Sequence, residues 1–228
     1  MPDVLTAEAD HAASDLAART VGEIAARLPG ATGVFRRHRL DYCCGGDVAL
    51  AEAAARRGAA LATILADLAA LTAAPAAQPQ ETGALIELIV ARYHDTHRRE
   101  LPELIGLARR VEAVHGGSPD APAGLAALLA GMESELLHHM VKEEYILFPL
   151  MRRGGHPMIA GPIDMVRHEH DGHAMALAEL ERITGGHEPP EDACNSWRAL
   201  YAGTRKLAED LVAHMHLENN VLFPRFEA

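Results

Sequence analysis

The sequence predicts an all-α protein, in which an antiparallel four-helix bundle follows a small helical N-terminal domain. Alanine and leucine are abundant and only 4% of the residues are aromatic, a composition that favours packed helices over sheets. Four long segments carry apolar residues at helical spacing, near 82–115, 121–151, 159–184 and 190–221. Short Gly- and Pro-containing breakers separate them, and long helices with short connections pack antiparallel.

The N-terminal domain is expected to span residues 1–71. Thr20 and Glu23 have the spacing of a capping box, which opens a short helix. A second short helix is expected at about 32–40, the turn D-Y-C-C-G-G follows at 41–46, and two further short helices complete the domain. Residues 72–81 contain two prolines and no residue that needs burial, so they are predicted to form a linker. The bundle then occupies residues 82–228.

Charge and composition exclude several classes of protein. The net charge of −11 argues against a nucleic-acid surface, which needs clustered Lys and Arg, and against binding to anionic membranes. No apolar run reaches the length of about 18 residues needed to cross a membrane, and the N-terminus lacks the pattern of a secretory signal. Three cysteines make no disulfide framework. A cytoplasmic protein with reduced thiols is therefore expected.

A motif that occurs twice in the bundle carries the chemistry. H-M-x-x-E-x-x-x-L-F-P begins at His139 and again at His214, 75 residues later. H-D-x-H begins at His94 and again at His170, 76 residues later. Each half of the bundle therefore has one helix with H-D-x-H followed by one with H-x-x-x-E. This indicates a duplicated helical hairpin with a pseudo-twofold axis.

The motif residues lie on the apolar seam of each helix. They are spaced three and four residues from aliphatic residues of the same helix, and these residues are expected to be buried. The predicted core positions nearest the motifs are Val90, Leu101, Leu136, Ile146, Ile163, Val166, Leu211 and Val221. His168 and His216 fall off the seam and are expected to be exposed. All four helices thus direct polar side chains into an aliphatic core at matching heights.

Two glutamates and at least four histidines in one apolar volume need a partner, because a buried carboxylate is costly unless it is paired or metal-bound. A lone seam histidine is usually only a packed core residue, and a single H-x-x-x-E pair arises often by chance. Two copies of both motifs in a common register favour a metal site instead. Imidazole and carboxylate ligands suit iron, manganese or zinc, and glutamates from two helices can bridge two ions. His97 and His173 also lie on the seam, and the pattern leaves open whether they contact metal.

Several further motifs occur in order along the chain. They are D-Y-C-C-G-G at 41–46, R-Y-H-D-x-H at 92–97, H-M-x-K-E-E-x-I-L-F-P at 139–149, E-H-D at 169–171 and H-x-x-L-E-N-N-V-L-F-P at 214–224. Together they resemble the di-iron iron–sulfur cluster repair family (the "repair of iron centres" proteins), which has a hemerythrin-like four-helix bundle as its C-terminal domain. The resemblance covers about residues 18 to 226.

The resemblance implies a cofactor of two non-haem iron ions with oxo and carboxylate bridges. The implied ligands are the histidines His94, His139, His170 and His214 and the bridging glutamates Glu143 and Glu218. The implied function is repair of iron–sulfur clusters damaged by nitric oxide or oxidative stress, by iron donation or removal of a nitrosyl group. Iron–sulfur proteins would be the clients, and nitric oxide or dioxygen the small ligand.

The cysteine pair Cys43 and Cys44 has two interpretations. Two small residues can simply fill a turn, and adjacent cysteines rarely close on each other because the ring is strained. The functional interpretation is a catalytic thiol pair that accepts iron, sulfur or nitric oxide and passes it on. A nearby helix N-terminus would lower the pKa of such a thiol. No role is assigned to Cys194.

Two other functions would use the same metal site. One is reduction of nitric oxide at the di-iron centre, and the other is binding of dioxygen or nitric oxide by a sensor. A thiol pair on a separate domain favours repair or reduction, because a sensor needs no such group. Whether the protein is an enzyme stays open at this stage, as does the choice between a monomer and a homodimer.

Overall fold

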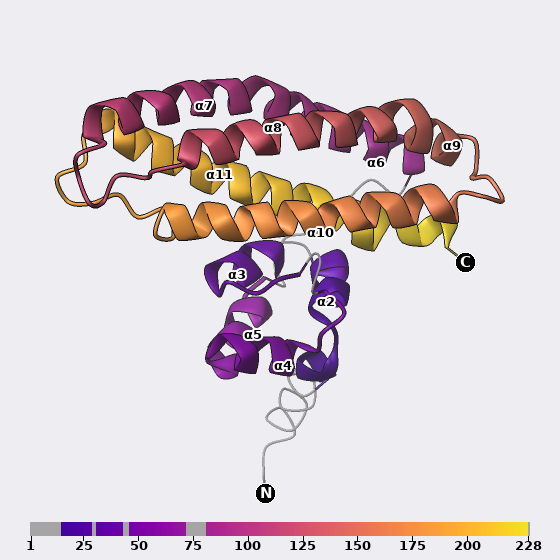
Figure 1. Cartoon of the computed structure of the whole chain (residues 1–228). Coiled ribbons are helices and arrows are strands. Elements are labelled where there is room, and N and C mark those ends of the chain that lie inside the picture. The colour runs from indigo at the N-terminus through magenta and orange to yellow at the C-terminus, as the bar shows by residue number, and fades with distance from the viewer. Residues whose placement is uncertain (1–14, 29–30, 43–45, 72–80, 228) are drawn as a thin grey trace, which may run out of the picture. The chain divides into compact units, whose positions relative to one another are not determined.

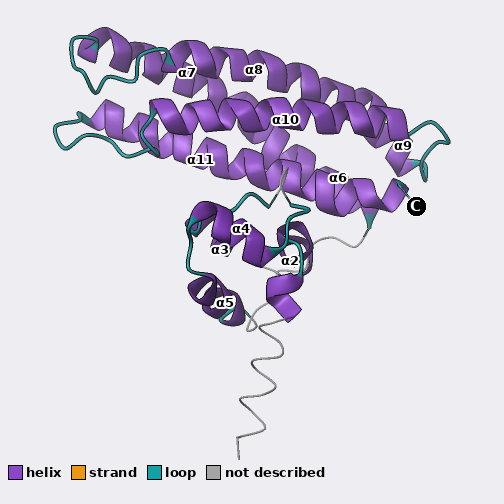
Figure 2. Cartoon of the chain, turned by 60° about the horizontal axis from the view of Figure 1, so that its bottom comes forward, coloured by secondary structure: helices purple, strands orange, loops and turns teal. Residues whose placement is uncertain are grey.

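The computed structural model describes residues 15–28, 31–42, 46–71 and 81–227. Cys43, Cys44 and nearly all of the predicted linker 72–81 lie outside these ranges. The described residues form helices and loops, and none of them forms a strand (Figure 2). The predicted all-α class, with a four-helix bundle after a helical N-terminal part, is confirmed.

The bundle consists of four long helices that alternate in direction (Figures 1 and 2). The first combines α6 (Thr82–Ile89), the π-helical turn η1 (Val90–His94) and α7 (Asp95–His115). The second combines α8 (Leu125–Lys142), the π-helical turn η2 (Glu143–Leu147) and α9 (Phe148–Arg152). The third is α10 (Ala160–Ile183). The fourth combines α11 (Asn195–Leu217), the π-helical turn η3 (Glu218–Leu222) and the 3₁₀-helix η4 (Phe223–Phe226).

Three of these helices thus contain a π-helical turn, and each turn begins or ends at a predicted ligand. The amide after each turn bonds the carbonyl oxygen five residues earlier, as from Phe148 to Glu143. Pro149 and Pro224 are each the second residue after a π-turn, in the L-F-P motifs. Proline has no N–H and crowds the carbonyl four residues back, so a wider turn relieves the clash. The repeated motif therefore encodes a local widening of the helix beside each glutamate.

The π-turns displace the buried seam by one residue from the predicted register. Ile146 is 56% exposed, and Val90 and Val221 are only half-buried, so the prediction that they are core residues was wrong. Their neighbours take the core positions instead: Ile89, Leu147 and Leu222. The reason is that each π-turn inserts one extra residue into the helical repeat. Helix α10 has no π-turn and keeps the predicted seam, with Ile163 and Val166 buried.

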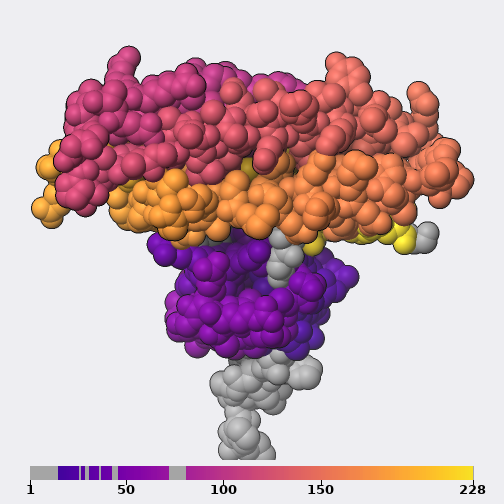
Figure 3. Space-filling model, viewed as in Figure 1, coloured from indigo at the N-terminus to yellow at the C-terminus, as the bar shows by residue number. Residues whose placement is uncertain are grey.

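The chain divides into two compact units, residues 1–79 with 215–224 and residues 80–214 with 225–228. The first unit contains α2 (Val21–Arg27), α3 (Ala31–Arg37), α4 (Leu50–Arg57) and α5 (Leu61–Ala69). The predicted capping box opens α2, since the Glu23 amide donates to Thr20 Oγ1 at 3.2 Å. In the second unit, atoms of α7, α8 and α10 are visible on the face seen in Figure 3. No described helix is long and apolar enough to cross a membrane.

His216 is buried, at 1% exposure, which corrects the prediction that it is exposed. Within the first unit its ring meets the Tyr42 ring edge-on at 5.2 Å, and its Nδ1 lies 3.3 Å from the Tyr42 carbonyl oxygen. The seam analysis considered only the bundle core, whereas this segment also packs against N-terminal residues on its other face. His168 is exposed, as predicted.

Candidate metal centre

The six side chains that the sequence analysis assigned as ligands lie in one buried cluster. Each comes from the middle of a long helix, and each is at most 1% exposed. His94 ends η1, Glu143 begins η2 and Glu218 begins η3. His139 lies in the last turn of α8, and the other two come from the interiors of α10 and α11, His170 and His214. Residues separated by more than a hundred positions in the sequence are thus brought together.

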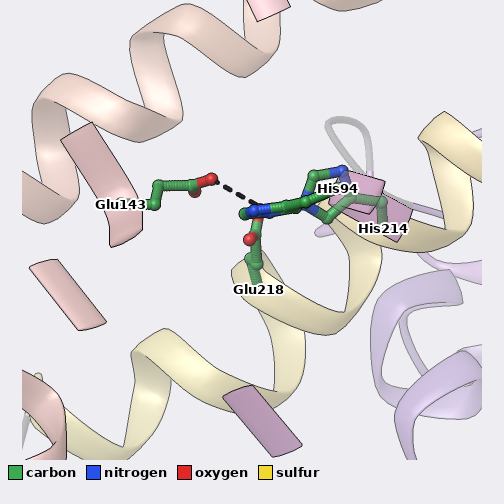
Figure 4. A group of neighbouring side chains, drawn as sticks. All are labelled: His94, Glu143, His214 and Glu218. Atoms are coloured by element: carbon green, nitrogen blue, oxygen red, sulfur yellow. Dashed lines mark hydrogen bonds and ion pairs between the residues drawn. The ribbon is translucent and has the colours of Figure 1, made fainter. Parts of the chain in front are cut away.

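The cluster consists of two groups that share both glutamates. Among the described residues, one group contains His94, Glu143, His214 and Glu218, and the donor atoms lie within 4.8 Å of one another (Figure 4). The other group joins the same two glutamates to His139 and His170 within the same limit. Each group therefore offers two imidazole nitrogens and two carboxylates. This is the arrangement that two metal ions with bridging carboxylates require.

Interatomic distances and burial support this assignment chemically. Nε2 of His94 lies 2.9 Å from Nε2 of His214, and Nε2 of His170 lies 3.2 Å from Nε2 of His139. The Glu143 oxygens lie 3.4 and 3.3 Å from Nε2 of His94 and of His139, respectively, and neither accepts a hydrogen bond from a described residue. Converging nitrogens around a carboxylate at 0% exposure need a cation between them. The residues present therefore fit a metal pair.

A carboxylate behind His94 determines which ring nitrogen faces the cluster. Glu144 Oε1 lies 2.6 Å from Nδ1 of His94, and Arg98 donates to the same oxygen at 2.7 Å. The hydrogen bond from His94 is the main cause that lowers the pKa of Glu144, so this group is an ionised acceptor. Nδ1 must then carry the proton, which leaves the Nε2 lone pair for a metal.

The same arrangement stands behind His139, built from a different helix. Glu169 accepts from Nδ1 of His139 at 2.8 Å and from the Lys142 ammonium. Burial raises the pKa of Glu169, but the hydrogen bonds from Lys142 and His139 outweigh it, and the pKa is lowered overall. Each group thus contains one histidine that is oriented by an ionised carboxylate, and each carboxylate has a cationic neighbour.

An aromatic ring covers another ligand. Tyr93 stacks on His214 with ring centroids 5.5 Å apart and an interplanar angle of 5°. The Arg92 guanidinium lies over the Tyr93 ring at 5.0 Å and also donates to both oxygens of Asp210, at 3.2 and 2.7 Å. This chain of contacts limits rotation of the His214 ring, because every member is held by its neighbour.

His97 and His173 belong to neither group of converging donors. Both are buried, at 1% and 4% exposure, and Nε2 of each has no hydrogen-bond partner among the described residues. Burial lowers the pKa of His97 to about 2 and that of His173 to about 3, so both are neutral near pH 7. The structure therefore places them beside the cluster rather than in it.

The sequence analysis missed the carboxylates that orient the histidines. Glu144 stands next to Glu143, and Glu169 next to His170, so both lie within the motifs already quoted. A carboxylate adjacent to a ligand in sequence was the only available signal. It gave no indication that each one would contact a histidine of another helix.

Two family models match the chain. The model described as Hemerythrin HHE cation binding domain matches residues 85–226. A second model, described as Domain of Unknown function (DUF542), matches residues 17–72. Between them they cover most of the described residues.

Curated relatives match nearly the whole chain. The iron-sulfur cluster repair protein YtfE of Yersinia pseudotuberculosis serotype O:1b (strain IP 31758) is 45% identical over 211 residues, covering 91% of this chain and 96% of the relative. The protein of the same name from Yersinia pestis (strain Pestoides F) has the same identity and coverage. The similarity therefore includes the N-terminal helices as well as the bundle.

Proposed function

Because the chain belongs to the family of iron–sulfur cluster repair proteins with a hemerythrin HHE cation binding domain, we propose that it repairs iron–sulfur clusters damaged by nitric oxide or oxidants. The observation that carries the proposal is the pair of histidine groups that share Glu143 and Glu218. A repair protein has to hold iron and release it, or take up a nitrosyl group. A buried site with exchangeable coordination positions suits both tasks.

Two iron ions are the proposed cofactor. Four imidazoles with two carboxylates give an N-rich donor set that suits iron, and the repeat supplies an equivalent pair of histidines for each ion. Two histidines and two bridging carboxylates leave positions of a six-coordinate ion open for a small ligand. When bound, the metal pair would supply iron or a nitrosyl-binding site, and the oxo bridge implied by the family would complete it.

The chain's own residues have three tasks in this proposal. Two of the histidines, His94 and His139, direct Nε2 toward the cluster, because the ionised Glu144 and Glu169 keep their Nδ1 protons in place. The shared glutamates compensate the charge of the ions. The surrounding aliphatic side chains, such as Leu136 and Leu222, exclude bulk water from the cluster.

We propose that Cys43 and Cys44 transfer iron or a nitrosyl group between the bundle and a client protein. Support comes from the residues on either side of the pair. Tyr42 is 1% exposed and lies against His216, while the Gly46 carbonyl accepts a hydrogen bond from the Gly22 amide at 2.8 Å. Both flanks of the thiol pair are thus anchored within the first unit. A cytoplasmic location fits these thiols, because a reducing compartment keeps them free.

The test uses the full-length, iron-loaded protein and a purified [4Fe–4S] enzyme that nitric oxide has inactivated. Under anaerobic conditions with a thiol reductant, the loaded protein should restore the activity of the client enzyme. Glu143→Ala, which cannot bridge two ions, should fail, and His168→Gln, on the exposed face of α10, should behave as the parent. Repair by Glu143→Ala at the parent's rate would contradict the proposal.

Two further measurements separate the thiol pair and the alternative functions from the metal site. The double variant Cys43→Ser, Cys44→Ser should keep its iron and lose repair activity. If it repaired the client as well as the parent, the role proposed for the thiols would be wrong. Nitrous oxide formed in catalytic amounts during nitric oxide titration would identify a reductase instead. Stoichiometric nitrosyl formation without any repair would identify a sensor.

A further inference from the structure

Two buried histidines, each with an Nε2 atom that has no hydrogen-bond partner among the described residues, form a polar layer beside the candidate metal centre. His97 follows His94 by three residues on α7, and His173 follows His170 by three residues on α10. The first and third helices of the bundle run in the same direction (Figure 1). Both histidines therefore lie about 4.5 Å further along the bundle axis than the ligands, toward the same end.

The second and fourth helices run in the opposite direction. Residues that precede the ligands on these two helices therefore lie at the same height along the bundle axis as His97 and His173. Leu136 precedes His139 by three residues, and Leu211 precedes His214 by three. The layer thus comprises two histidines and two leucines, and all four are buried at 4% exposure or less. Beyond it the core continues with aliphatic side chains such as Leu101 and Leu207.

The contacts of the two histidines follow the pseudo-twofold axis. The His97 ring lies 5.5 Å from the His214 ring, and the His173 ring lies 4.9 Å from the His139 ring in an edge-on arrangement. Each therefore touches the H-x-x-x-E ligand of a different group of the metal centre. Packing alone does not require an imidazole at either place, because leucine fills the neighbouring positions of the layer.

Nε2 of both histidines is buried without a hydrogen-bond partner among the described residues. Unpaired buried polar atoms are destabilising, so two of them at equivalent positions indicate a partner that binds there. The partner must be small, since the layer is fully enclosed, and it must be polar. In the tautomer that carries its proton on Nε2, each ring can donate one hydrogen bond from this unpaired atom.

We propose that His97 and His173 form the polar wall of a binding site for a small ligand of the metal pair, a diatomic molecule or small anion, and donate hydrogen bonds to it. The inference rests on the metal centre proposed above. The two histidines hold the ligand in place without being metal ligands themselves. They thereby distinguish molecules that accept a hydrogen bond from those that do not.

The test uses azide as the probe, because this anion both coordinates iron and accepts hydrogen bonds. The variants are His97→Leu, His173→Leu and the double variant, in the full chain with oxidised iron, and His168→Leu is the exposed control. Measured quantities are iron per chain, the azide Kd from absorbance titration, and the azide stretching frequency in H₂O and D₂O. We expect unchanged iron, a Kd raised about 10-fold for each histidine removed, and loss of the D₂O shift in the double variant.

Two results would overturn the inference. One is an unchanged Kd and D₂O shift in the double variant. The other is loss of iron from either single variant, which would make that histidine a metal ligand. Absence of iron from the parent would instead refute the proposed metal centre. If a leucine variant fails to fold, His97→Gln and His173→Gln, which keep an N–H donor, should bind azide with a Kd close to the parent's, and a 10-fold weaker Kd would contradict the proposal.

Discussion

Replacement of Glu144 tests whether a carboxylate outside the ligand set controls metal affinity. Glu144 holds the Nδ1 proton of His94 through a 2.6 Å hydrogen bond. Glu144→Gln keeps an oxygen acceptor but removes the charge, whereas Glu144→Ala removes both. We therefore expect graded weakening of the ion held by His94 and His214, with little effect on the other ion.

The size of the effect follows from the environment of the bond. A hydrogen bond to a charged group contributes about 1.5–3 kcal/mol, or roughly 10- to 100-fold in affinity. Loss of such partners of metal-bound histidines weakens metal binding by about the same factor. The Glu144 side chain is 21% exposed and its neighbour Arg98 is 31% exposed, so solvent screens part of the charge. We expect about a 10-fold loss for Glu144→Gln and about 100-fold for Glu144→Ala.

The assay is an anaerobic titration of the metal-free protein with ferrous iron in competition with a chelator. The parent should take up two ions, and the variants should show a second, weaker phase for one of them. Glu135→Gln, an exposed glutamate on the same helix, is the matched control. An affinity of Glu144→Ala within twofold of this control would refute the reasoning that the carboxylate orients His94.

Three further predictions concern the bridges, an ion pair and a close contact. Glu218→Ala should weaken the binding of both iron ions, because Glu218 belongs to both groups, and elemental analysis should show that both are lost. Loss of a single ion would contradict a bridging role. Burial raises the pKa of Asp210, but hydrogen bonds from Arg92 and a lysine outweigh this effect, and the pKa is lowered overall. The ionised Asp210 therefore stabilises the folded state above about pH 4, and this contribution is lost as the pH falls through the lowered pKa. Asp210→Asn in the metal-free protein should therefore cost about 1–3 kcal/mol in urea unfolding at pH 7, with a smaller difference from the parent below pH 4, and a gap that widened in acid would reverse the sign. Gly22→Ala should lower the Tm, since its Cβ would lie 2.9 Å from a carbonyl oxygen, whereas Gly131→Ala, with open space around it, should raise stability by about 0.5–1 kcal/mol.

The sequence by itself determined the fold class and identified the residues that the structure brings together. Helical periodicity carries this information, because positions three and four residues apart must share a face. The spacing alone therefore places the two H-x-x-x-E pairs and the two H-D-x-H segments on the inner faces of their helices. Their repetition indicated that the halves of the bundle contribute equally.

Only the tertiary structure decided the register beside the ligands and the partners of the ligands. The π-turns insert one residue each, so Leu147 rather than Ile146 is buried, and a fixed period of 3.6 residues does not predict this. The partners of His94 and His139 lie 50 and 30 residues away on other helices, Glu144 and Glu169. Periodicity specifies the face of one helix, whereas such contacts depend on the rotation and height of a neighbouring helix. Packing of the whole bundle sets those two quantities.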